Sequence, residues 1–415
     1  MLKVIRVNMD TKNIKIEEFD TNITFGNRGL IDKTLIEEVD PKCDPLGSDN
    51  KLVFATGLFA GYNFPTGNRL SAGAKSPLTG TIKESSVGGT AGTNLGMHGI
   101  KMIIFEDMPS NDEWYFLRID GDGDITLESA EKYLSKGTYE TAEELKKEYG
   151  GKTTSVCAIG PAGERMYKIA SIQVTDFTTQ TPSRACGRGG LGAVMGSKHI
   201  KAIVIERANE KAKLPAMDEE KVKSLIKELT KSTVESPTKS MFESMGTTGL
   251  LSMVTIPMNA YPVQNFSGKM IPDEKADLIG NGYMERINQY GGKQGVGCQA
   301  GCPIKCSNFY CDEEGKLITS GLEYETVALG GPNCDIYDWD YIAEFDHICD
   351  NIGVDTIDMG NAIAIAMDAG YIPWGDIEAA RKILQEFKDG EGFGNILGNG
   401  AQAVGDYFKH NRIPT

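Results

Sequence analysis

The pattern of hydrophobic and polar residues changes character about half-way along the chain. Up to about residue 208, apolar residues alternate with polar ones or form blocks of four, which predicts β-strands. The expected strands are Leu2–Val7, Ile14–Phe19, Lys51–Thr56, Lys101–Glu106, Trp114–Ile119, Ser155–Ile159 and Ile200–Ile205. Short helices are expected near residues 30–38 and 127–150. The first half is therefore predicted to be β-rich.

From about Asp218 the apolar period becomes helical. The expected amphipathic helices are Asp218–Ser232, Asp338–Asn351, Asp355–Ala369, Asp376–Phe387 and Gln402–His410. The boundary falls in the charged segment 208–215, which ends at a proline. The predicted fold class is thus α+β, with a β-rich domain over residues 1–208 and a mostly helical domain over residues 209–415.

The composition narrows the classes of function. The chain has 415 residues, of which 40% are hydrophobic and 24% charged, as in ordinary globular proteins. It contains no run of 18 apolar residues, so no membrane span is expected. The net charge of −15 argues against nucleic acid as a partner. Nine cysteines with no export signal predict a cytoplasmic location, where clustered thiols bind metal or react.

Three cysteines lie within nine residues, namely Cys298, Cys302 and Cys306, and are separated by glycine, proline and small residues. Such loops let several sulfurs converge on one metal centre. Zinc usually requires a second pair of ligands, and the sequence has neither a second CxxC pair nor a histidine close by. An iron–sulfur cluster is therefore favoured, with a zinc site or unliganded thiols as the alternatives.

Two glycine-rich elements with arginines occur in the β-rich half. One comprises Pro65–Arg69, Lys75–Gly80 and Val87–Gly92, and the other is Arg184–Gly192. Glycine lets backbone amides approach a ligand closely, and arginine offers a bidentate fork for phosphate or carboxylate. Two such elements suit a large anionic cofactor, although tight turns between strands would explain either one alone.

Two formal motif matches fail in their context. The pattern Gly187-x-Gly189-x-x-Gly192 resembles a dinucleotide fingerprint, but the residues before it do not form a buried strand. Four acidic residues have the spacing of a calcium loop: Asp120, Asp122, Asp124 and Glu131. Ile125 stands where that loop needs glycine, so a solvated turn is expected instead.

The helical half carries a small set of candidate polar residues. Glu344 and His347 fall at i and i+3 on one helix face, as in half of a di-iron site, and a surface ion pair is the alternative. Gly353 is expected to end one helix and Asp355 to cap the next. Glu325 would be a proton acceptor if buried, although the polar composition of the segment Glu323–Glu325 favours exposure.

Taken in order, these stretches resemble the aldehyde:ferredoxin oxidoreductase family of tungsten or molybdenum bis-pterin enzymes. The resemblance covers nearly the whole chain and rests on Arg6–Thr11, Pro65–Arg69, Lys75–Gly80, Ile159–Glu164, Arg184–Lys198, the cysteine loop, Glu323–Glu325 and Cys349–Asp355. It implies that a tungstopterin or molybdopterin is held by Arg69, Ser86, Gly88, Gly89, Arg184, Ala185, Gly187, Asp350, Gly353 and Asp355. A magnesium ion bridging the pterin phosphates is a further expectation.

The resemblance also implies roles for the remaining candidates. Cys298, Cys302 and Cys306 would ligate a [4Fe–4S] cluster, and Glu325 would assist proton transfer near the metal. Glu344 and His347 would contribute to a single iron between the subunits of a homo-oligomer. The expected reaction is oxidation of aldehydes or related carbonyl compounds to carboxylic acids, with ferredoxin as electron acceptor. A non-catalytic cofactor-binding or assembly subunit is the alternative.

Three departures from the family pattern qualify these expectations. The cysteine spacing is C-x3-C-x3-C where the family has C-x2-C-x3-C. Ser86 stands where the archaeal form has asparagine. The D-x-x-G-L-C motif of the family's third domain, which supplies the fourth cluster ligand, is not in this sequence. A separate chain that supplies this third domain is therefore a predicted partner, and Cys311 or Cys334 is the alternative source of the fourth ligand.

Overall fold

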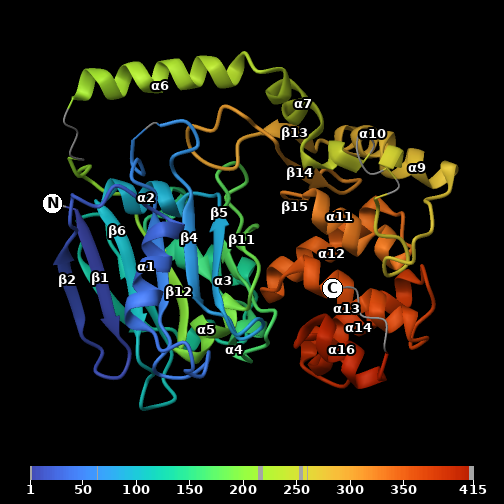
Figure 1. Ribbon diagram of the computed structural model, residues 1–415, viewed down its shortest axis with the longest axis horizontal. Helices are drawn as coiled ribbons and strands as arrows, with labels where there is room; N and C mark the ends of the chain where they lie inside the picture. The colour runs from blue at the N-terminus through green and yellow to red at the C-terminus, as the bar shows by residue number, and fades with distance from the viewer. Residues whose placement is uncertain (1, 63, 214–217, 252–255, 259, 411–415) are drawn as a thin grey trace. The chain divides into compact units, whose positions relative to one another are not determined.

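The structure is a computed structural model that describes residues 2–62, 64–213, 218–251, 256–258 and 260–410. The chain divides into two compact units (Figure 1). The first unit comprises Met1–Glu235, Gly297–Pro303 and Asn351–Val354, and the second comprises Ser236–Val296, Ile304–Asp350 and Asp355–Thr415. The domain boundary at residue 208 stays a prediction, and part of the predicted linker 208–215 lies outside the described residues.

The first unit contains two six-stranded sheets. The first sheet has the order β2-β1-β6-β3-β4-β5. Its strands are β1 (Lys3–Asn8), β2 (Ile14–Glu18), β3 (Leu52–Thr56), β4 (Leu70–Lys75), β5 (Ile82–Val87) and β6 (Ile100–Glu106). Only β1 and β6 pair in parallel; the other neighbours are antiparallel. Mixed pairing of this kind is common in α+β folds.

The second sheet has the order β11-β10-β9-β12-β7-β8. Its strands are β7 (Tyr115–Ile119), β8 (Ile125–Ser129), β9 (Ser155–Ala158), β10 (Ile172–Val174), β11 (Arg184–Cys186) and β12 (Ile200–Ile205). Here β7 and β12 form the parallel pair. The helices of this unit are α1 (Arg28–Glu38), α2 (Ala91–Met97), α3 (Thr138–Glu148), α4 (Pro161–Glu164), α5 (Leu191–Ser197) and α6 (Glu219–Val234), with short 3-10 turns η1 (Glu131–Tyr133) and η2 (Gly151–Thr153).

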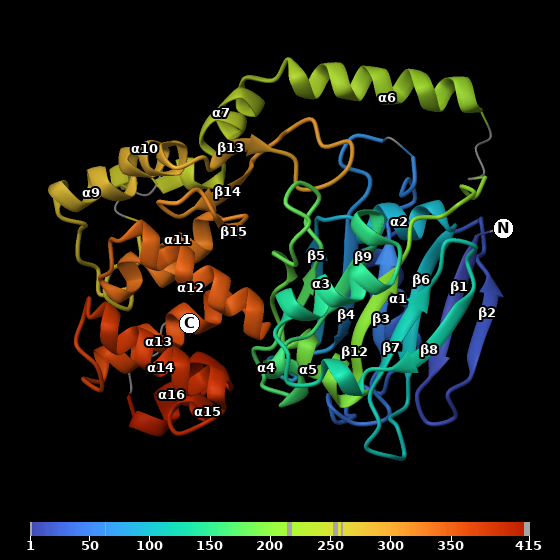
Figure 2. The ribbon, with the colours of Figure 1, turned by 180° about the vertical axis from the view of Figure 1, so that it is seen from behind.

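The side-chain alternation of the strands builds the layers of this unit. Leu52 and Phe54 of β3 join a core shared by both sheets, whereas Val53 and Ala55 pack with α1 on the other face. In the second sheet the same alternation sends alternate residues of β9 and β12 into the shared core and the others against α3. Helix α1 therefore covers one sheet (Figure 1) and α3 covers the other (Figure 2).

The second unit is mostly helical, with one small antiparallel sheet of β13 (Lys293–Val296), β14 (Ser307–Cys311) and β15 (Leu317–Ser320). Its helices are α7 (Pro237–Met245), α8 (Ile256–Met258), α9 (Asp273–Ile279), α10 (Asn281–Gln289), α11 (Tyr324–Gly330), α12 (Trp339–Ile352), α13 (Thr356–Asp368), α14 (Ile377–Asp389), α15 (Gly394–Leu397) and α16 (Gly400–Phe408), with 3-10 turns η3 (Thr247–Gly249) and η5 (Pro332–Cys334). Helix α13 is apolar on most sides and packs centrally against α11 and α16.

The predicted α+β class is confirmed, and the seven predicted strands and five later helices occur within two residues of their expected bounds. The helix predicted over residues 127–150 was wrong in its first half, where β8 and η1 precede α3. The acidic turn after β7 is confirmed as a turn, because the Asp120 carboxylate accepts the backbone N–H groups of Asp122 and Asp124. Within the described ranges, no helix has the length and apolar character to cross a bilayer.

Candidate cofactor-binding site

The cysteine loop Gly297–Pro303 belongs to the first unit and lies directly on the glycine loop that follows β5. The backbone N–H of Gly89 donates to the carbonyl oxygen of Cys298 at 2.6 Å, and Gly89 forms a parallel β-bridge with Gln299. A Cβ atom at Gly88 would lie 3.0 Å from the Cys298 carbonyl oxygen and 3.2 Å from its sulfur. This close approach explains the need for glycine at position 88.

Three further hydrogen bonds fix the cysteine loop to the first unit. The Thr178 hydroxyl donates to the Gly297 carbonyl at 3.0 Å. The side-chain amide of Asn68 donates to Ala300 O at 3.3 Å, and that of Gln299 donates to Thr66 O at 3.4 Å. Together with the Gly89 contact, these bonds show that three separate loops of the first unit hold the cysteine loop.

Two of the three clustered thiols meet in this loop. The side chains of Cys298 and Cys302 are hydrogen-bonded to each other, and this contact, followed by burial, raises the pKa of the Cys298 thiol. The guanidinium groups of Arg184 and Arg69 act in the opposite direction and lower that pKa. The guanidinium groups of Arg184 and Arg69 are thus close enough to act on the Cys298 sulfur, although the pKa of this thiol is raised overall. Cys306 is half-buried and belongs to the second unit.

Arg184, at the start of β11, is buried and paired with a buried carboxylate. Its Nε donates to Asp176 Oδ2 at 2.6 Å, and the side chain of Asp176 is fully enclosed. The other carboxylate oxygen of Asp176 accepts the backbone N–H groups of Thr178 and Thr179, both at 2.7 Å. Asp176 therefore holds both Arg184 and the loop whose Thr178 reaches the cysteine loop. Asp176 was not among the predicted site residues, although Asp followed by Phe-Thr-Thr is typical of an Asx turn.

Arg69 precedes β4 and is held at the edge of the first sheet by Ser86 on β5. Its Nε donates to the Ser86 hydroxyl at 2.8 Å and its Nη2 to the Ser86 carbonyl at 3.0 Å. These contacts follow from the strand register, which places Ser71 opposite Ser86. Across the site, a Cβ atom at Gly187 would meet only the Cβ of Ala185, at 3.8 Å. The backbone at Gly187 therefore has room for a neighbouring group.

The first unit thus brings together Arg69, Ser86, Gly88, Gly89, Arg184, Cys298 and Cys302, with Ala185 and Gly187 adjoining Arg184 on the chain. Gly353 also belongs to this unit and ends α12 with φ +80°, as predicted. Its carbonyl accepts the N–H of Ser171, just before β10. The other predicted site residues belong to the second unit.

Asp350 and Asp355 are both buried in the second unit. The Asp355 carboxylate accepts the N–H of Ile357 at 2.9 Å and caps α13, which confirms the predicted cap. Burial, followed by the nearby carboxylates of Asp346, Asp350 and Asp355, raises the pKa of Cys349 well above its ordinary value. Glu325 is exposed on the first turn of α11.

Glu344 and His347 line one cavity of about 380 Å³ in the second unit, together with Arg286, Asp312, Asp340 and Arg381. The Glu344 carboxylate accepts Nε and Nη2 of Arg381 at 2.9 and 2.7 Å. Burial lowers the pKa of His347, which keeps its imidazole neutral near pH 7. No three His, Cys, Asp or Glu side chains in the described part of the chain are placed to hold one metal ion.

Comparison with known proteins first identifies the fold. The active-site complex of benzoyl coenzyme A reductase with 1,5-dienoyl-CoA superposes with a TM-score of 0.82, covering 99% of this chain and 63% of that chain at 23% identity. The N-terminal domain of aldehyde ferredoxin oxidoreductase matches residues 4–207, and domains 2 and 3 of that enzyme match residues 224–413. The chain belongs to the aldehyde ferredoxin oxidoreductase family, a family of oxidoreductases, as the sequence resemblance predicted.

Two curated relatives come from Pyrococcus furiosus. A tungsten-containing aldehyde ferredoxin oxidoreductase is 32% identical over 99% of this chain and 68% of its own length. A WOR-like subunit of an aliphatic sulfonate oxidoreductase is 27% identical over 96% of this chain and 66% of its own length. The chain therefore spans about two thirds of the length of the relatives it matches.

Proposed function

We propose that this chain is the cofactor-binding part of an oxidoreductase that converts aldehydes or related carbonyl compounds to carboxylic acids. A tungsten- or molybdenum-pterin would be the redox centre, and a [4Fe–4S] cluster would pass electrons to a ferredoxin-like carrier. The observation that carries this proposal is the placement of Cys298 against Gly88, with Arg69 and Arg184 close enough to affect its pKa.

The residues of the first unit fit an anionic pterin. Arg69 and Arg184 present guanidinium groups, which suit phosphate. The backbone at Gly187 has open space beside it, whereas that at Gly88 is packed against the cysteine loop. In this proposal Gly89, Ala185 and Gly187 offer backbone contacts, and Ser86 contacts a magnesium ion at the phosphates. Gly353 of the same unit is a further proposed contact, and the roles of Asp350 and Asp355 stay predictions from the resemblance. The bound pterin metal supplies two-electron redox chemistry.

The donor set of the cysteine loop fits an iron–sulfur cluster. Cys298 and Cys302 are already adjacent, and Cys306 follows four residues later along the chain. Cys334 is a poor fourth ligand, since it is buried and its thiol donates to the carbonyls of Leu329 and Gly360. We therefore propose that the fourth ligand comes from the third domain of the family.

The carboxylates of the second unit differ in how well they suit the proposed roles. The exposed Glu325 remains our candidate for accepting a proton from the substrate or its hydrate. The Glu344–His347 pair fits a shared iron poorly, because Arg381 already engages the Glu344 carboxylate. We assign that pair no step in the reaction. A cytoplasmic, homo-oligomeric enzyme remains our expectation.

The test is aldehyde-dependent reduction of a viologen dye by the holoenzyme purified anaerobically from its native host. We expect turnover with aldehydes and no turnover by the isolated, cofactor-loaded chain, which lacks a third-domain partner in this proposal. Turnover with an aliphatic sulfonate and not with aldehydes would contradict the proposed substrate class. Tungsten- or molybdenum-loaded protein with no turnover on any carbonyl compound would favour the assembly-subunit alternative.

A further inference from the structure

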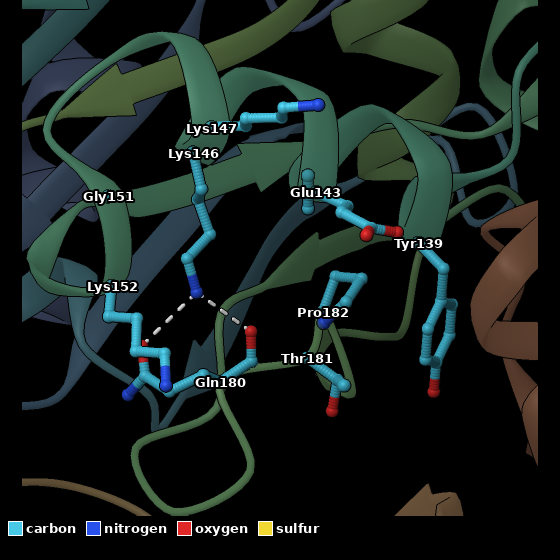
Figure 3. Close-up of a pocket in the computed structure, with 10 residues that line it drawn as sticks. Tyr139, Glu143, Lys146, Lys147, Gly151, Lys152, Gln180, Thr181 and Pro182 are labelled. Carbon is cyan, nitrogen blue, oxygen red and sulfur yellow. Dashed lines mark hydrogen bonds between the residues drawn. The ribbon is translucent and has the colours of Figure 1, made fainter.

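A basic cavity of about 350 Å³ opens on the first unit between α3 and the loop that follows β10 (Figure 3). Three lysines line it, Lys146, Lys147 and Lys152, against the single carboxylate of Glu143. The whole chain, in contrast, has 58 acidic and 43 basic side chains. The cavity is therefore net positive on a chain whose overall charge is negative.

The positive charge of the cavity is not cancelled by the neighbouring acidic residues. The other carboxylates of α3 are engaged elsewhere, since Glu148 pairs with Lys132, and Glu140 and Glu144 pair with Lys136. Within the described ranges, neither Lys147 nor Lys152 forms an ion pair, and both are exposed. These two ammonium groups are available to an anionic partner.

One wall of the cavity belongs to the loop that positions the candidate cofactor site. Lys146 is buried, and its ammonium donates to the carbonyl and side-chain oxygens of Gln180 at 2.9 and 3.2 Å (Figure 3). Two residues before Gln180, Thr178 donates to the carbonyl of Gly297, the neighbour of Cys298. A partner at the cavity would therefore lie one loop away from a proposed cluster ligand.

We infer that this cavity is the docking point for an acidic electron-carrier protein of the ferredoxin class. This inference rests on the proposed function and names the surface that its electron acceptor would use. Acidic side chains of the carrier would meet Lys147 and Lys152, and the exposed Phe177 on the same loop offers an apolar contact. Charge complementarity of this kind steers encounter, and redox encounters use small interfaces.

The test compares two double variants of the holoenzyme expressed in the native host. Lys147→Glu/Lys152→Glu reverses the charge of the cavity, and Lys221→Glu/Lys227→Glu makes the same charge change on exposed lysines of α6. We expect the KM for a purified acidic [4Fe–4S] ferredoxin to rise at least about tenfold in the cavity variant at low ionic strength, and the difference to shrink with added salt. The α6 variant should keep a KM within about twofold of wild type.

Viologen-linked turnover separates this inference from the proposed function, because the small dye needs no docking surface. Unchanged dye turnover with an unchanged ferredoxin KM in the cavity variant would overturn the inference. So would binding of inorganic phosphate in the cavity without any effect of the variant on ferredoxin, because the cavity would then be a small-anion site. Absence of dye turnover even in the wild-type protein would overturn the proposed function. The docking surface would then be tested separately, by comparing the direct binding of ferredoxin to the two variants.

Discussion

The charged candidate residues of the two units differ in their burial and in their partners. In the first unit, Arg184 and Asp176 are buried as a pair, and Arg184 acts electrostatically on a thiol from a distant part of the chain. In the second unit, Glu344 forms a half-exposed ion pair and Asp355 caps a helix. Burying charge is costly, and the buried pair also holds the loop whose Thr178 reaches the cysteine loop, so we interpret this region as functional. This contrast supports the proposal that residues of the first unit form the base of the cofactor site.

The largest effect is expected from removing a thiol of the cysteine loop. Cys302→Ser should abolish the proposed cluster, so iron should fall from about four per chain to nearly none and ferredoxin-linked turnover should disappear. Cys43→Ser is the matched control, because Cys43 is a nearly buried cysteine of the same unit outside the site. Iron analysis of both variants is the measurement. Full iron content in Cys302→Ser would show that the cysteine loop does not ligate an iron–sulfur cluster.

The second-largest effect is expected from breaking the buried ion pair of Asp176 and Arg184. Asp176→Asn leaves the Arg184 guanidinium buried without its counter-charge, which should lower the free energy of unfolding by roughly 3–5 kcal/mol and reduce bound pterin. Asp120→Asn is the control, since Asp120 accepts two backbone N–H groups in an exposed turn without an arginine. Denaturation curves and pterin content should separate the variants. Equal, small losses would show that the pair is ordinary loop structure.

A third prediction uses an ammonium that the first unit buries without a carboxylate. Lys198 donates to the carbonyls of Asn50 and Asp107, and burial lowers its pKa from 10.5 to about 8. The Lys198 amine therefore binds its proton more tightly in the unfolded state than in the folded state. Burying the charged ammonium destabilises the fold to its full extent below about pH 8, and this destabilisation vanishes above about pH 10.5. Wild type should gain roughly 3 kcal/mol relative to Lys198→Met between pH 7 and pH 10.5.

The measurement for this prediction is chemical denaturation of wild type and Lys198→Met at both pH values. Comparing each variant with wild type removes the contribution of the other titrating groups, including the buried cysteines. Lys227→Met, at an exposed position on α6, is the control and should show no pH-dependent difference. A difference between wild type and Lys198→Met that does not change with pH would contradict a lowered pKa at Lys198.

The smallest effect is expected in the second unit. Glu344→Gln removes a partly exposed ion pair with Arg381, so stability should change by less than about 1 kcal/mol. Iron content and dye-linked turnover should stay at the wild-type level, because the account gives Glu344 no catalytic step. Loss of about half an iron per chain, which is one iron for every two chains, would instead support the interface iron suggested by the sequence resemblance and would contradict the contrast between the units.

The fold was predictable where apolar residues carry a strong period. Strand β12 is apolar except at Lys201, and α14 has a clear amphipathic pattern; both occur at the expected positions. Strand β4 was missed although all six residues are buried, because its Ser, Ala and Gly residues carry no apolar signal. The helix predicted over residues 127–150 was wrong only in its first half, because β8 pairs with β7, which local periodicity does not reveal.

The candidate site was predictable as a set of residues but not as an arrangement. Spacing and glycine content singled out Cys298 and Gly88, yet their contact joins positions 210 residues apart, which no local pattern encodes. Asp176 was missed because its importance depends on being buried beside Arg184, a property of packing. The structural duty of Asp355 was predictable, because a helix cap is a local feature.

The most direct test of the central claim is elemental analysis of W, Mo, Fe and Zn in the protein purified anaerobically from its native host. The account predicts about four iron atoms and about one tungsten or molybdenum atom per chain. Iron without either heavy metal would leave a cluster protein with no pterin metal. Zinc alone would contradict the account, because the cysteine loop on Gly88–Gly89 would then be a structural zinc site.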